Sequence, residues 1–246
     1  MGASFSGTFE TKEQADDFGN VVKYIIPVLA EGGILLKVQK DTMIINVYQK
    51  NILTHVVSRG IYNKFTMVDD TKIGILKPAD FVKYINMFAE NSSVSFEDNV
   101  FTITNGDSDV SFRTADVDLI KEGPATFKGT TFVADVMIDS RFDRFAKAMS
   151  VLANEDTVNV KGDKATGKVT FKIANASMAV NTFKLVIDKI AVADDFEFKY
   201  SKEDFLAILQ TPIPTKKMSF AEKLLRLECT SANLDITYYI PKKAAK

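Results

Sequence analysis

Of the 246 residues, 46% are hydrophobic and 26% are charged, the balance of an ordinary globular protein. The 31 basic and 32 acidic side chains give a formal net charge of −1, which excludes a strongly basic DNA-binding module. Nothing approaches the roughly 20 consecutive apolar residues that a membrane span needs, and no secretory signal pattern opens the chain. A single cysteine, Cys229, excludes an intrachain disulfide, so we expect an intracellular protein with no membrane contact.

Two helices are predicted in the first half of the chain. The first should begin at Thr11, because Gln14 three residues later completes a capping-box pattern, and should end at Gly32. Pro27 lacks the N–H that a helix interior needs, so we expect a kink or an early last turn there. Pro78, a favoured first-turn residue, predicts the second helix. The apolar residues at helical spacing are Phe18, Val21, Val22, Ile25 and Leu29, then Phe81, Tyr84, Ile85 and Phe88.

Two further helices are predicted in the second half. One follows Asp139 or Ser140, and the other begins near Ser201 and must stop before Pro212. Their expected inward-facing residues are Phe142, Phe145, Met149 and Leu152, then Phe205, Ile208 and Leu209.

Between the helices the apolar pattern has a period of two, which predicts strands. These cover residues 34–38, 42–48, 52–58, 94–104, 108–114, 157–161, 168–173, 178–187, 194–200, 224–229 and 233–240. Short strands separated by turn signals favour antiparallel sheets. Residues 115–130, which contain Gly123 and Pro124, have little periodicity and are predicted to connect two domains, residues 1–114 and 131–246.

The sequence repeats itself at a shift of 124 residues. The matched pairs include Phe18 with Phe142, Lys37 with Lys161, Asp80-Phe81 with Asp204-Phe205, and Ser95-Phe96 with Ser219-Phe220. A shorter shift of 60 places Val22–Ile25 on the identical Val82–Ile85, although amphipathic helices followed by strands also resemble one another without a repeat. The two shifts indicate two related domains, each built from two related segments.

No motif predicts a catalytic site. Gly162 to Lys168 has the spacing of a phosphate-binding loop, but Val169 stands where Ser or Thr should hold magnesium, so we expect a hairpin turn. The single histidine, His55, lies in a predicted strand, where a structural or surface role is expected. Cys229 should be a small buried residue. No metal-ligand spacing is present, so we expect no enzyme activity, metal or cofactor.

Basic side chains gather on the predicted helices. Arg141, Arg144 and Lys147 recur at intervals of three beside an apolar stripe. The other helices carry Lys12, Lys23, Lys83 and Lys202. A solvated helix face is the alternative interpretation. If a closed oligomer turns the helices toward its axis, these groups would line a central hole, with the acidic excess on the outer sheet surface, and would contact DNA phosphates without sequence preference.

The repeat, the connector and the end of the chain together resemble the DNA sliding clamps, the family of proliferating cell nuclear antigen, its archaeal relatives and the phage clamps. Tyr238 to Lys242 resembles the ending of eukaryotic and archaeal clamps, and Phe112 to Asp116 is similar to a phage clamp. The resemblance implies an α+β fold of two duplicated clamp domains, each with two helices packed on curved antiparallel sheets. It also implies a homotrimeric ring whose bore is lined by the helices.

The resemblance implies three sets of site residues. The DNA-binding residues of the bore would be Lys12, Lys23, Lys83, Arg141, Arg144, Lys147 and Lys202. The subunit interface would contain Val110, Phe112, Val180, Phe183 and Val186. A hydrophobic pocket beneath the connector, for peptides of partner proteins, would contain Val47, Ile52, Leu119, Ile120, Tyr239 and Pro241. Asn51, where cellular clamps commonly carry histidine, and the basic tail Lys242–Lys246 depart from the family pattern.

The implied function is that of a non-enzymatic processivity factor, which encircles double-stranded DNA, tethers DNA polymerase, and is opened by a separate ATP-driven clamp loader. It would work at replicating DNA, in the cytoplasm or nucleoid for a phage or archaeal clamp and in the nucleus for a eukaryotic one. The alternatives are a subunit of a heterotrimeric or checkpoint-type clamp, a β-rich interaction protein that does not bind DNA, and an enzyme whose site the sequence does not reveal.

Overall fold

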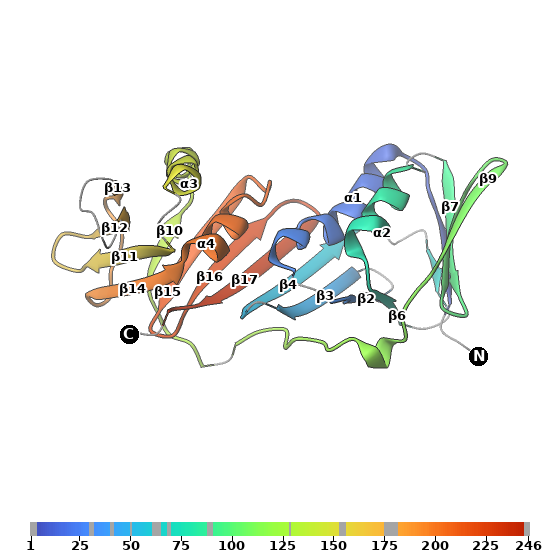
Figure 1. Cartoon of the computed structure of the whole chain (residues 1–246), viewed down its shortest axis with the longest axis horizontal. Coiled ribbons are helices and arrows are strands. Elements are labelled where there is room, and N and C mark those ends of the chain that lie inside the picture. The colour runs from blue at the N-terminus through green and yellow to red at the C-terminus, as the bar shows by residue number, and fades with distance from the viewer. Residues whose placement is uncertain are drawn as a thin grey trace. The chain divides into compact units, whose positions relative to one another are not determined.

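The repeat predicted from the sequence corresponds to two compact units, Met1–Ala125 with Ala232–Ile236 (unit 1) and Thr126–Ser231 with Thr237–Lys246 (unit 2). The structure is a computed structural model (Figure 1). It describes residues 4–29, 32–39, 42–49, 51–60, 65–67, 70–87, 91–127, 129–152, 156–174 and 182–243.

Both units repeat the same order of elements. In unit 1 the order is β1 (Phe5–Phe9), α1 (Lys12–Lys23), η1 (Ile26–Val28), β2 (Ile34–Val38), β3 (Thr42–Gln49), β4 (Ile52–Arg59), β5 (Thr66–Met67), β6 (Thr71–Ile75), α2 (Pro78–Met87), β7 (Ser92–Glu97), β8 (Val100–Asn105) and β9 (Ser108–Arg113). The connector contains η3 (Val117–Leu119). Unit 2 contains β10 (Phe132–Met137), α3 (Arg141–Val151), β11 (Thr157–Asp163), β12 (Lys168–Ala174), β13 (Thr182–Ile187), β14 (Phe196–Ser201), α4 (Lys202–Leu209), β15 (Thr215–Ala221), β16 (Leu224–Thr230) and β17 (Leu234–Pro241).

Each unit consists of two segments in which a strand, a helix and three strands follow one another, and the first strands of the two segments are exchanged. In unit 1, β1 pairs antiparallel with β7 of the second segment, and β6 pairs with β2 of the first. In unit 2, β10 pairs with β15 and β14 with β11 in the same way. The 60-residue and 124-residue shifts therefore correspond to real structural repeats, and each unit is α+β with antiparallel sheets, as predicted.

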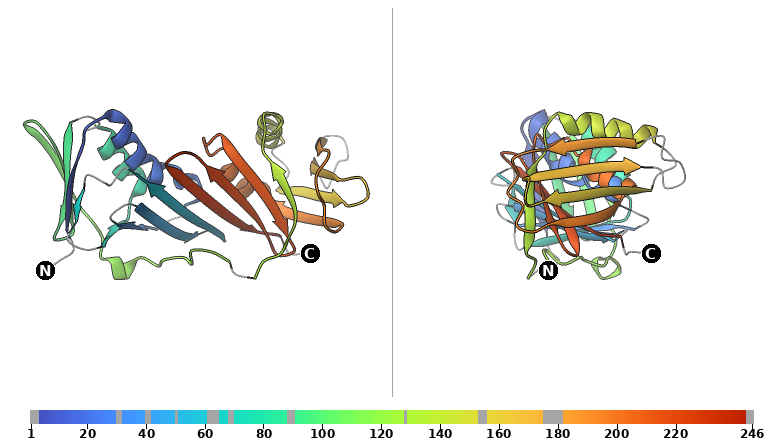
Figure 2. Two further views of the ribbon diagram at one scale, coloured as in Figure 1. Left: turned by 180° about the vertical axis from the view of Figure 1, so that it is seen from behind. Right: turned by 90° about the vertical axis from the view of Figure 1, so that its left-hand side faces the viewer.

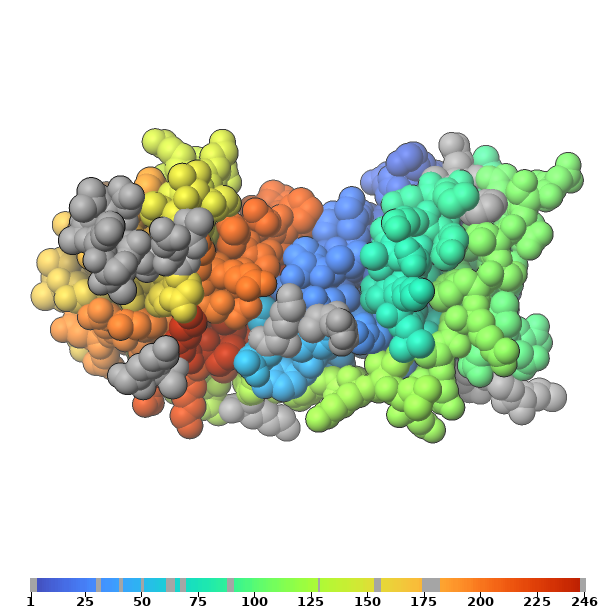
Figure 3. Space-filling view, in the orientation of Figure 1, coloured from blue at the N-terminus to red at the C-terminus, as the bar shows by residue number. Residues whose placement is uncertain are grey.

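The core of unit 1 is an aromatic cluster beneath the helix pair α1 and α2. These helices pack against each other and lie side by side on the surface of the unit (Figure 3). Phe18 of α1 lies 5.4 Å from Phe9 of β1 and 6.2 Å from Phe81 of α2, measured between ring centroids. Phe81 lies 5.3 Å from Phe101 of β8. All four rings are buried, and burying each contributes about 1.5–3 kcal/mol.

Unit 2 has an equivalent cluster. Phe171 of β12 lies at its centre, 5.0 Å from Phe142 and 5.9 Å from Phe145 of α3. Phe205 of α4 and Phe220 of β15 contact the same ring at 6.3 Å and 5.9 Å. Helices α3 and α4 therefore cover one face of the sheet β13-β12-β11-β14. We call the face away from the helices of the same unit the outer face.

The predicted helix starts are confirmed. Thr11 caps α1 by accepting a hydrogen bond from the Gln14 N–H at 3.3 Å, and Ser201 caps α4 in the same way. α2 begins at Pro78 and α3 directly after Ser140. The predicted end of the first helix at Gly32 was wrong, because α1 ends at Lys23. A 3-10 turn at Ile26–Val28 follows, in agreement with the early last turn expected at Pro27. Phe88 lies outside the described residues.

Some strand predictions were wrong or incomplete. Residues 94–104, predicted as one strand, form β7 and β8, because Asp98 and Asn99 take positive φ angles of 50° and 62° and make a tight hairpin. Strands β5, β6, β10 and β15 were also not predicted, because they are short or carry charges such as Lys216 and Lys217. The hairpin turn expected between Gly162 and Lys168 is confirmed between β11 and β12.

Gly162 offers a test of the packing in unit 2. It lies in β11 opposite Phe196 of β14, and a Cβ added at Gly162 would lie 2.1 Å from Cε1 of that ring. Forcing a methyl group into this space should lower the free energy of unfolding by about 1–3 kcal/mol in Gly162→Ala, measured by urea denaturation. In a Phe196→Leu background the same substitution should cost much less. Equal costs in both backgrounds would show that the ring is not what excludes a side chain.

Candidate nucleic-acid interface and connector site

The basic face of α3 is the strongest concentration of positive charge on any helix. Arg141, Arg144 and Lys147 are all exposed, on the side opposite the buried Phe142 and Phe145. α3 carries these three basic side chains and a single acidic one, Asp143, whereas α1 carries two basic and three acidic side chains. The cationic surface therefore lies in unit 2 more than in unit 1.

The basic residues of the helices differ in whether a carboxylate neutralises them. The Arg141 guanidinium forms an ion pair with the Asp139 carboxylate, with Nη2 2.6 Å from Oδ2. This contact lowers the pKa of the Asp139 carboxyl. The remaining pairs are Lys12 with Asp16 at 2.6 Å and Lys83 with Asp80 at 3.0 Å. Within the described part of the chain, no ion pair involves Lys23, Arg144 or Lys147. These three charges are the ones available to an anionic ligand.

Lys202 has a structural role. Its Nζ donates a hydrogen bond of 2.6 Å to the carbonyl oxygen of Leu152, the residue that follows α3. Lys216 does the same at the end of α4, where Nζ donates to the carbonyl of Leu209 at 2.6 Å. A cation at a helix C-terminus satisfies a free carbonyl and interacts favourably with the helix dipole. Lys202 therefore belongs to the scaffold of the helix pair rather than to its exposed cationic face.

The connector lies on the outer face of the unit 1 sheet, with α1 and α2 on the other side (Figure 1). Ala115 donates its N–H to the Gly74 carbonyl at 2.8 Å, and Gly123 donates to the Asn46 carbonyl at 3.2 Å. Between these points Ile120 fills a notch above two glycines, because a Cβ added at Gly33 or at Gly74 would lie 3.0 Å from its Cδ1. The connector is thus held at both ends and in the middle.

A chain of polar groups joins the connector to three strands. The Glu122 carboxylate lies 2.5 Å from Nζ of Lys37 on β2 and accepts a hydrogen bond from Nδ2 of Asn46 on β3 at 2.8 Å. The Asn46 Oδ1 lies 2.6 Å from Nδ1 of His55 on β4. Burial and the neighbouring Arg59 lower the pKa of His55, so the imidazole is neutral at pH 7. This network gives the single histidine a structural role.

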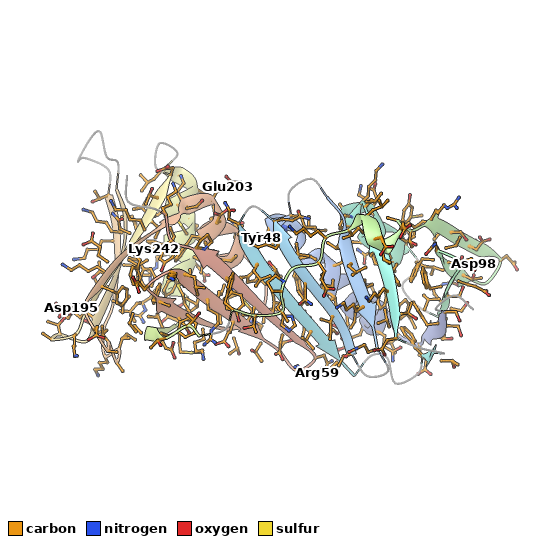
Figure 4. All side chains as sticks on the ribbon, turned by 90° about the horizontal axis from the view of Figure 1, so that it is seen from below. Tyr48, Arg59, Asp98, Asp195, Glu203 and Lys242 are labelled. Carbon is orange, nitrogen blue, oxygen red and sulfur yellow. The ribbon has the colours of Figure 1, made fainter. Side chains whose placement is uncertain are left out.

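The four predicted pocket residues that belong to unit 1 do not lie on one surface of that unit. Val47 and Ile52 are buried, and strand alternation turns them to the face opposite Tyr48 and Leu53, which lie on the connector side. Leu119 is 76% exposed on the connector, whereas Ile120 is buried beneath it. Tyr48, half exposed beside the connector (Figure 4), and Leu53, which contacts Gly123, were missed by the sequence analysis.

The remaining two pocket residues belong to unit 2. Tyr239 is buried, its hydroxyl lies 3.0 Å from Oγ1 of Thr126, and its ring contacts Phe127 at 5.3 Å. Pro241, at the end of β17, is exposed. The aromatic pair Phe127–Tyr239 thus anchors the end of the connector region to the last strand of unit 2.

The residues predicted for the subunit interface lie on two edge strands. Among the described strands, β9 is the last strand of its sheet and pairs only with β8, and β13 is the last strand of its sheet and pairs only with β12. Val110 and Val186 are half-buried. Phe112 contacts Phe81 at 5.4 Å, and Phe183 contacts Phe145 at 5.9 Å, so both rings extend the cores to the sheet margins. Val180 lies outside the described residues.

Little in the described residues suggests reaction chemistry. Burial raises the pKa of the Cys229 thiol to about 12, so it is not a reactive thiolate. In the residues that the structure describes, no three His, Cys, Asp or Glu side chains are placed to hold a metal ion. None of the described helices is both long and apolar enough to cross a membrane.

The duplicated fold with paired helices is that of the sliding clamps. A proliferating cell nuclear antigen from Entamoeba histolytica has a similar structure, with a TM-score of 0.77 and 12% sequence identity over 98% of this chain and 99% of that one. A chain of the PCNA2–PCNA3 complex from Sulfolobus tokodaii is similar with a TM-score of 0.72 and 15% identity, over 98% of this chain and 100% of that one. No protein-family model matches the sequence, and no curated protein is significantly similar to it.

Acidification should loosen the connector. Burial alone would raise the pKa of Glu122, but hydrogen bonds from Lys37 and Asn46 outweigh it and lower the pKa. The attachment should be complete above the ordinary Glu pKa of about 4.3 and should be lost as the pH falls through the lowered value. We expect Glu122→Gln to reduce amide-exchange protection at Gly123 about fivefold at pH 7, equivalent to about 1 kcal/mol. Glu97→Gln should have no effect; unchanged protection in Glu122→Gln would contradict this role.

Proposed function

We propose that the chain is the subunit of a sliding clamp, which closes into a ring around double-stranded DNA and tethers DNA polymerase and other replication proteins to it. The observation that carries the proposal is the duplicated clamp fold over 98% of the chain, combined with one edge strand in each unit that can pair with another subunit. Such a protein acts by confinement, so it needs no catalytic residue and no cofactor. It would work inside the cell, at replicating DNA.

The edge strands support ring closure. The outer side of β9 and the outer side of β13 carry no strand in the described structure, so their main-chain groups are available for pairing. Exposed edges favour association, and pairing β9 of one subunit with β13 of the next would remove both. Repeating this head-to-tail contact produces a closed ring, for which we propose three subunits, with Phe112 and Phe183 at the margins of each contact.

The charges on α3 support DNA binding. Arg141 and Arg144 occupy the first turns of the helix, where a positive charge opposes the helix dipole, and only Arg141 has a carboxylate partner, Asp139, among the described residues. Helix stability therefore does not explain them, whereas contact with phosphates does. Such contacts carry no sequence information and weaken with salt, which allows a ring to slide.

The connector supports a partner site. Leu119 and Tyr48 expose 76% and 50% of their surface on unit 1, where a partner peptide could bury them. We propose that polymerase and other partners bind here. Because the chain offers no nucleotide-binding loop, ring opening would fall to a separate clamp loader.

A heteromeric ring is the second candidate, because one structural relative is a chain of a PCNA2–PCNA3 complex. Light scattering on the purified protein separates the two. A self-closing trimer should have a mass of about 82 kDa, three times the 27.3 kDa of one chain. A mass of 27.3 kDa at micromolar concentration would argue against self-closure and favour a ring with other subunits.

Threading onto linear duplex DNA tests the proposed function without a loader. The protein should associate with linear DNA whose ends are free and should be excluded when both ends are blocked by bulky protein caps. The capped and uncapped DNAs should have the same length and sequence, so that they differ only in whether their ends are free. Association that does not depend on the ends would show ordinary binding rather than encirclement, and would overturn the proposal.

Charge reversal on α3 should weaken the hold on DNA. Arg144→Glu with Lys147→Glu should reduce association with open-ended DNA at least tenfold and lower the salt slope, because each lost phosphate contact reduces it by about 0.9. Lys164→Glu with Lys168→Glu changes the charge equally at exposed, ion-paired sites of unit 2 and should have little effect. If both pairs weaken association equally, the DNA does not contact α3.

A further inference from the structure

Three lysines form a row across the outer face of the sheet β13-β12-β11-β14 of unit 2. Lys199 pairs with Asn159, Asn159 with Lys172, and Lys172 with Lys184, so the four residues lie side by side on adjacent strands. The neighbouring positions of the same strands, such as Phe171, turn to the opposite face and join the core. The right-hand view of Figure 2 looks onto this sheet. We call Lys172, Lys184 and Lys199 the lysine row.

The lysine row lacks the compensation that other lysines of the unit have. All three side chains are exposed, and no ion pair within the described residues involves them. Lys172 and Lys184 stand directly opposite each other, an arrangement that destabilises a sheet. By contrast, Lys164 and Lys168 pair with Asp194 and Asp188. An external anion would relieve this repulsion.

Unit 1 shows which kind of anion its equivalent face accepts. Lys37 and Lys72 are also cross-strand partners on the outer face of their sheet. There, however, the extended connector supplies a carboxylate, because its Glu122 lies 2.5 Å from Lys37 and is also stabilised electrostatically by Lys72. The neighbouring Asp116 and Asp118 make this segment acidic. A lysine pair on this scaffold is thus neutralised by an extended acidic segment.

The two faces are related by the repeat. In unit 1, Ala115 enters the connector by donating its N–H to the Gly74 carbonyl of β6 at 2.8 Å. In unit 2, Lys243 follows β17 and donates its N–H to the Lys199 carbonyl of β14 at 2.7 Å. The same main-chain step therefore leads onto both faces. By this register Lys37 and Lys72 correspond to Lys161 and Glu197, and the lysine row lies two residues further along the strands, where it remains exposed.

We propose that the lysine row binds an extended acidic segment of a partner protein, in the manner in which unit 1 holds its own connector. The described side chains on this face include no aromatic ring on which bases could stack, which disfavours single-stranded nucleic acid. Glu197 lies opposite Lys161 and Asp188 pairs with Lys168, both on the same side of the lysine row. An acidic segment that runs along the row, across the strands, would stay clear of both carboxylates. The proposal goes beyond the proposed function and does not require a ring.

A labelled peptide of ten glutamates tests the proposal by fluorescence anisotropy with the full chain. It should bind at low salt and weaken as salt rises. The variant Lys172→Gln, Lys184→Gln, Lys199→Gln should raise the Kd at least tenfold. The matched variant Lys164→Gln, Lys168→Gln, Lys217→Gln removes three ion-paired lysines of the same unit and should change the Kd less than threefold. Unaltered melting curves of both variants would show that the fold is retained.

Several outcomes would overturn the proposal. These are equal losses in the two triple variants, no peptide binding at low salt, or a larger loss in Arg144→Glu with Lys147→Glu, which would place the peptide on α3. A ten-nucleotide single strand that binds as tightly as the peptide, and is lost in the same row variant, would instead identify a nucleic-acid surface. Threading onto open-ended DNA should survive in the row variant, so failure of this proposal is distinguishable from failure of the clamp function.

Discussion

The exchange of first strands between the two segments of each unit is the constraint on which the rest of the structure depends. Because β1 completes the sheet of β7, β8 and β9, and β6 completes that of β2, β3 and β4, neither segment of unit 1 has a sheet of its own. The aromatic core is likewise shared, with Phe9 and Phe18 from one segment and Phe81 and Phe101 from the other. Each unit should therefore fold cooperatively as a whole. The exchange also ends the sheets at β9 and β13, so the edges available for assembly follow from the same topology.

Positive charges in this protein can be sorted by whether folding requires them. Lys202 and Lys216 cap the C-termini of α3 and α4, where a cation is favourable. Arg144 lies near the N-terminus of α3, where a cation is unfavourable, and has no ion-pair partner among the described residues. The lysine row is unfavourable for a different reason, because two of its members face each other across adjacent strands. Charged residues that destabilise the isolated chain indicate ligand-binding surfaces. Here they indicate two different surfaces of unit 2.

Local signals predicted the helices well, because a cap or a proline acts over three or four residues. Thr11, Pro78, Ser140 and Ser201 each marked a helix start correctly. The repeat also predicted the duplicated fold. The split of residues 94–104 was missed, because the Asp98–Asn99 turn interrupts a pattern that remains apolar on both sides. Strand exchange could not be predicted, since it depends on which distant strands become neighbours.

The candidate sites were harder to predict for the same reason. Alternation along β3 separates Val47 from Tyr48, but the sequence does not say which face the connector covers. The expected acidic excess on the outer sheet surface stays a prediction, and the lysine row on the outer face of β13-β12-β11-β14 was not foreseen. Its members are separated by 12 or more residues in the sequence and become neighbours only through strand register. Periodicity within one strand carries no information about such a row.

The two units have related sheets but differ in the source of the negative charge that neutralises the lysines on the outer face. Lys37 and Lys72 tolerate each other because the Glu122 carboxylate pairs with Lys37 and interacts electrostatically with Lys72, so in unit 1 the counter-ion is part of the chain. In unit 2 the positions equivalent to Lys37 and Lys72 hold Lys161 and Glu197, a pair of opposite charge, and the lysine row lies next to them with no ion pair among the described residues. A like-charge pair without a counter-ion is a small cost to the isolated protein, and the cost falls when an anion arrives. The energetic role that the connector plays within unit 1 is therefore left, in unit 2, to a segment supplied by another molecule.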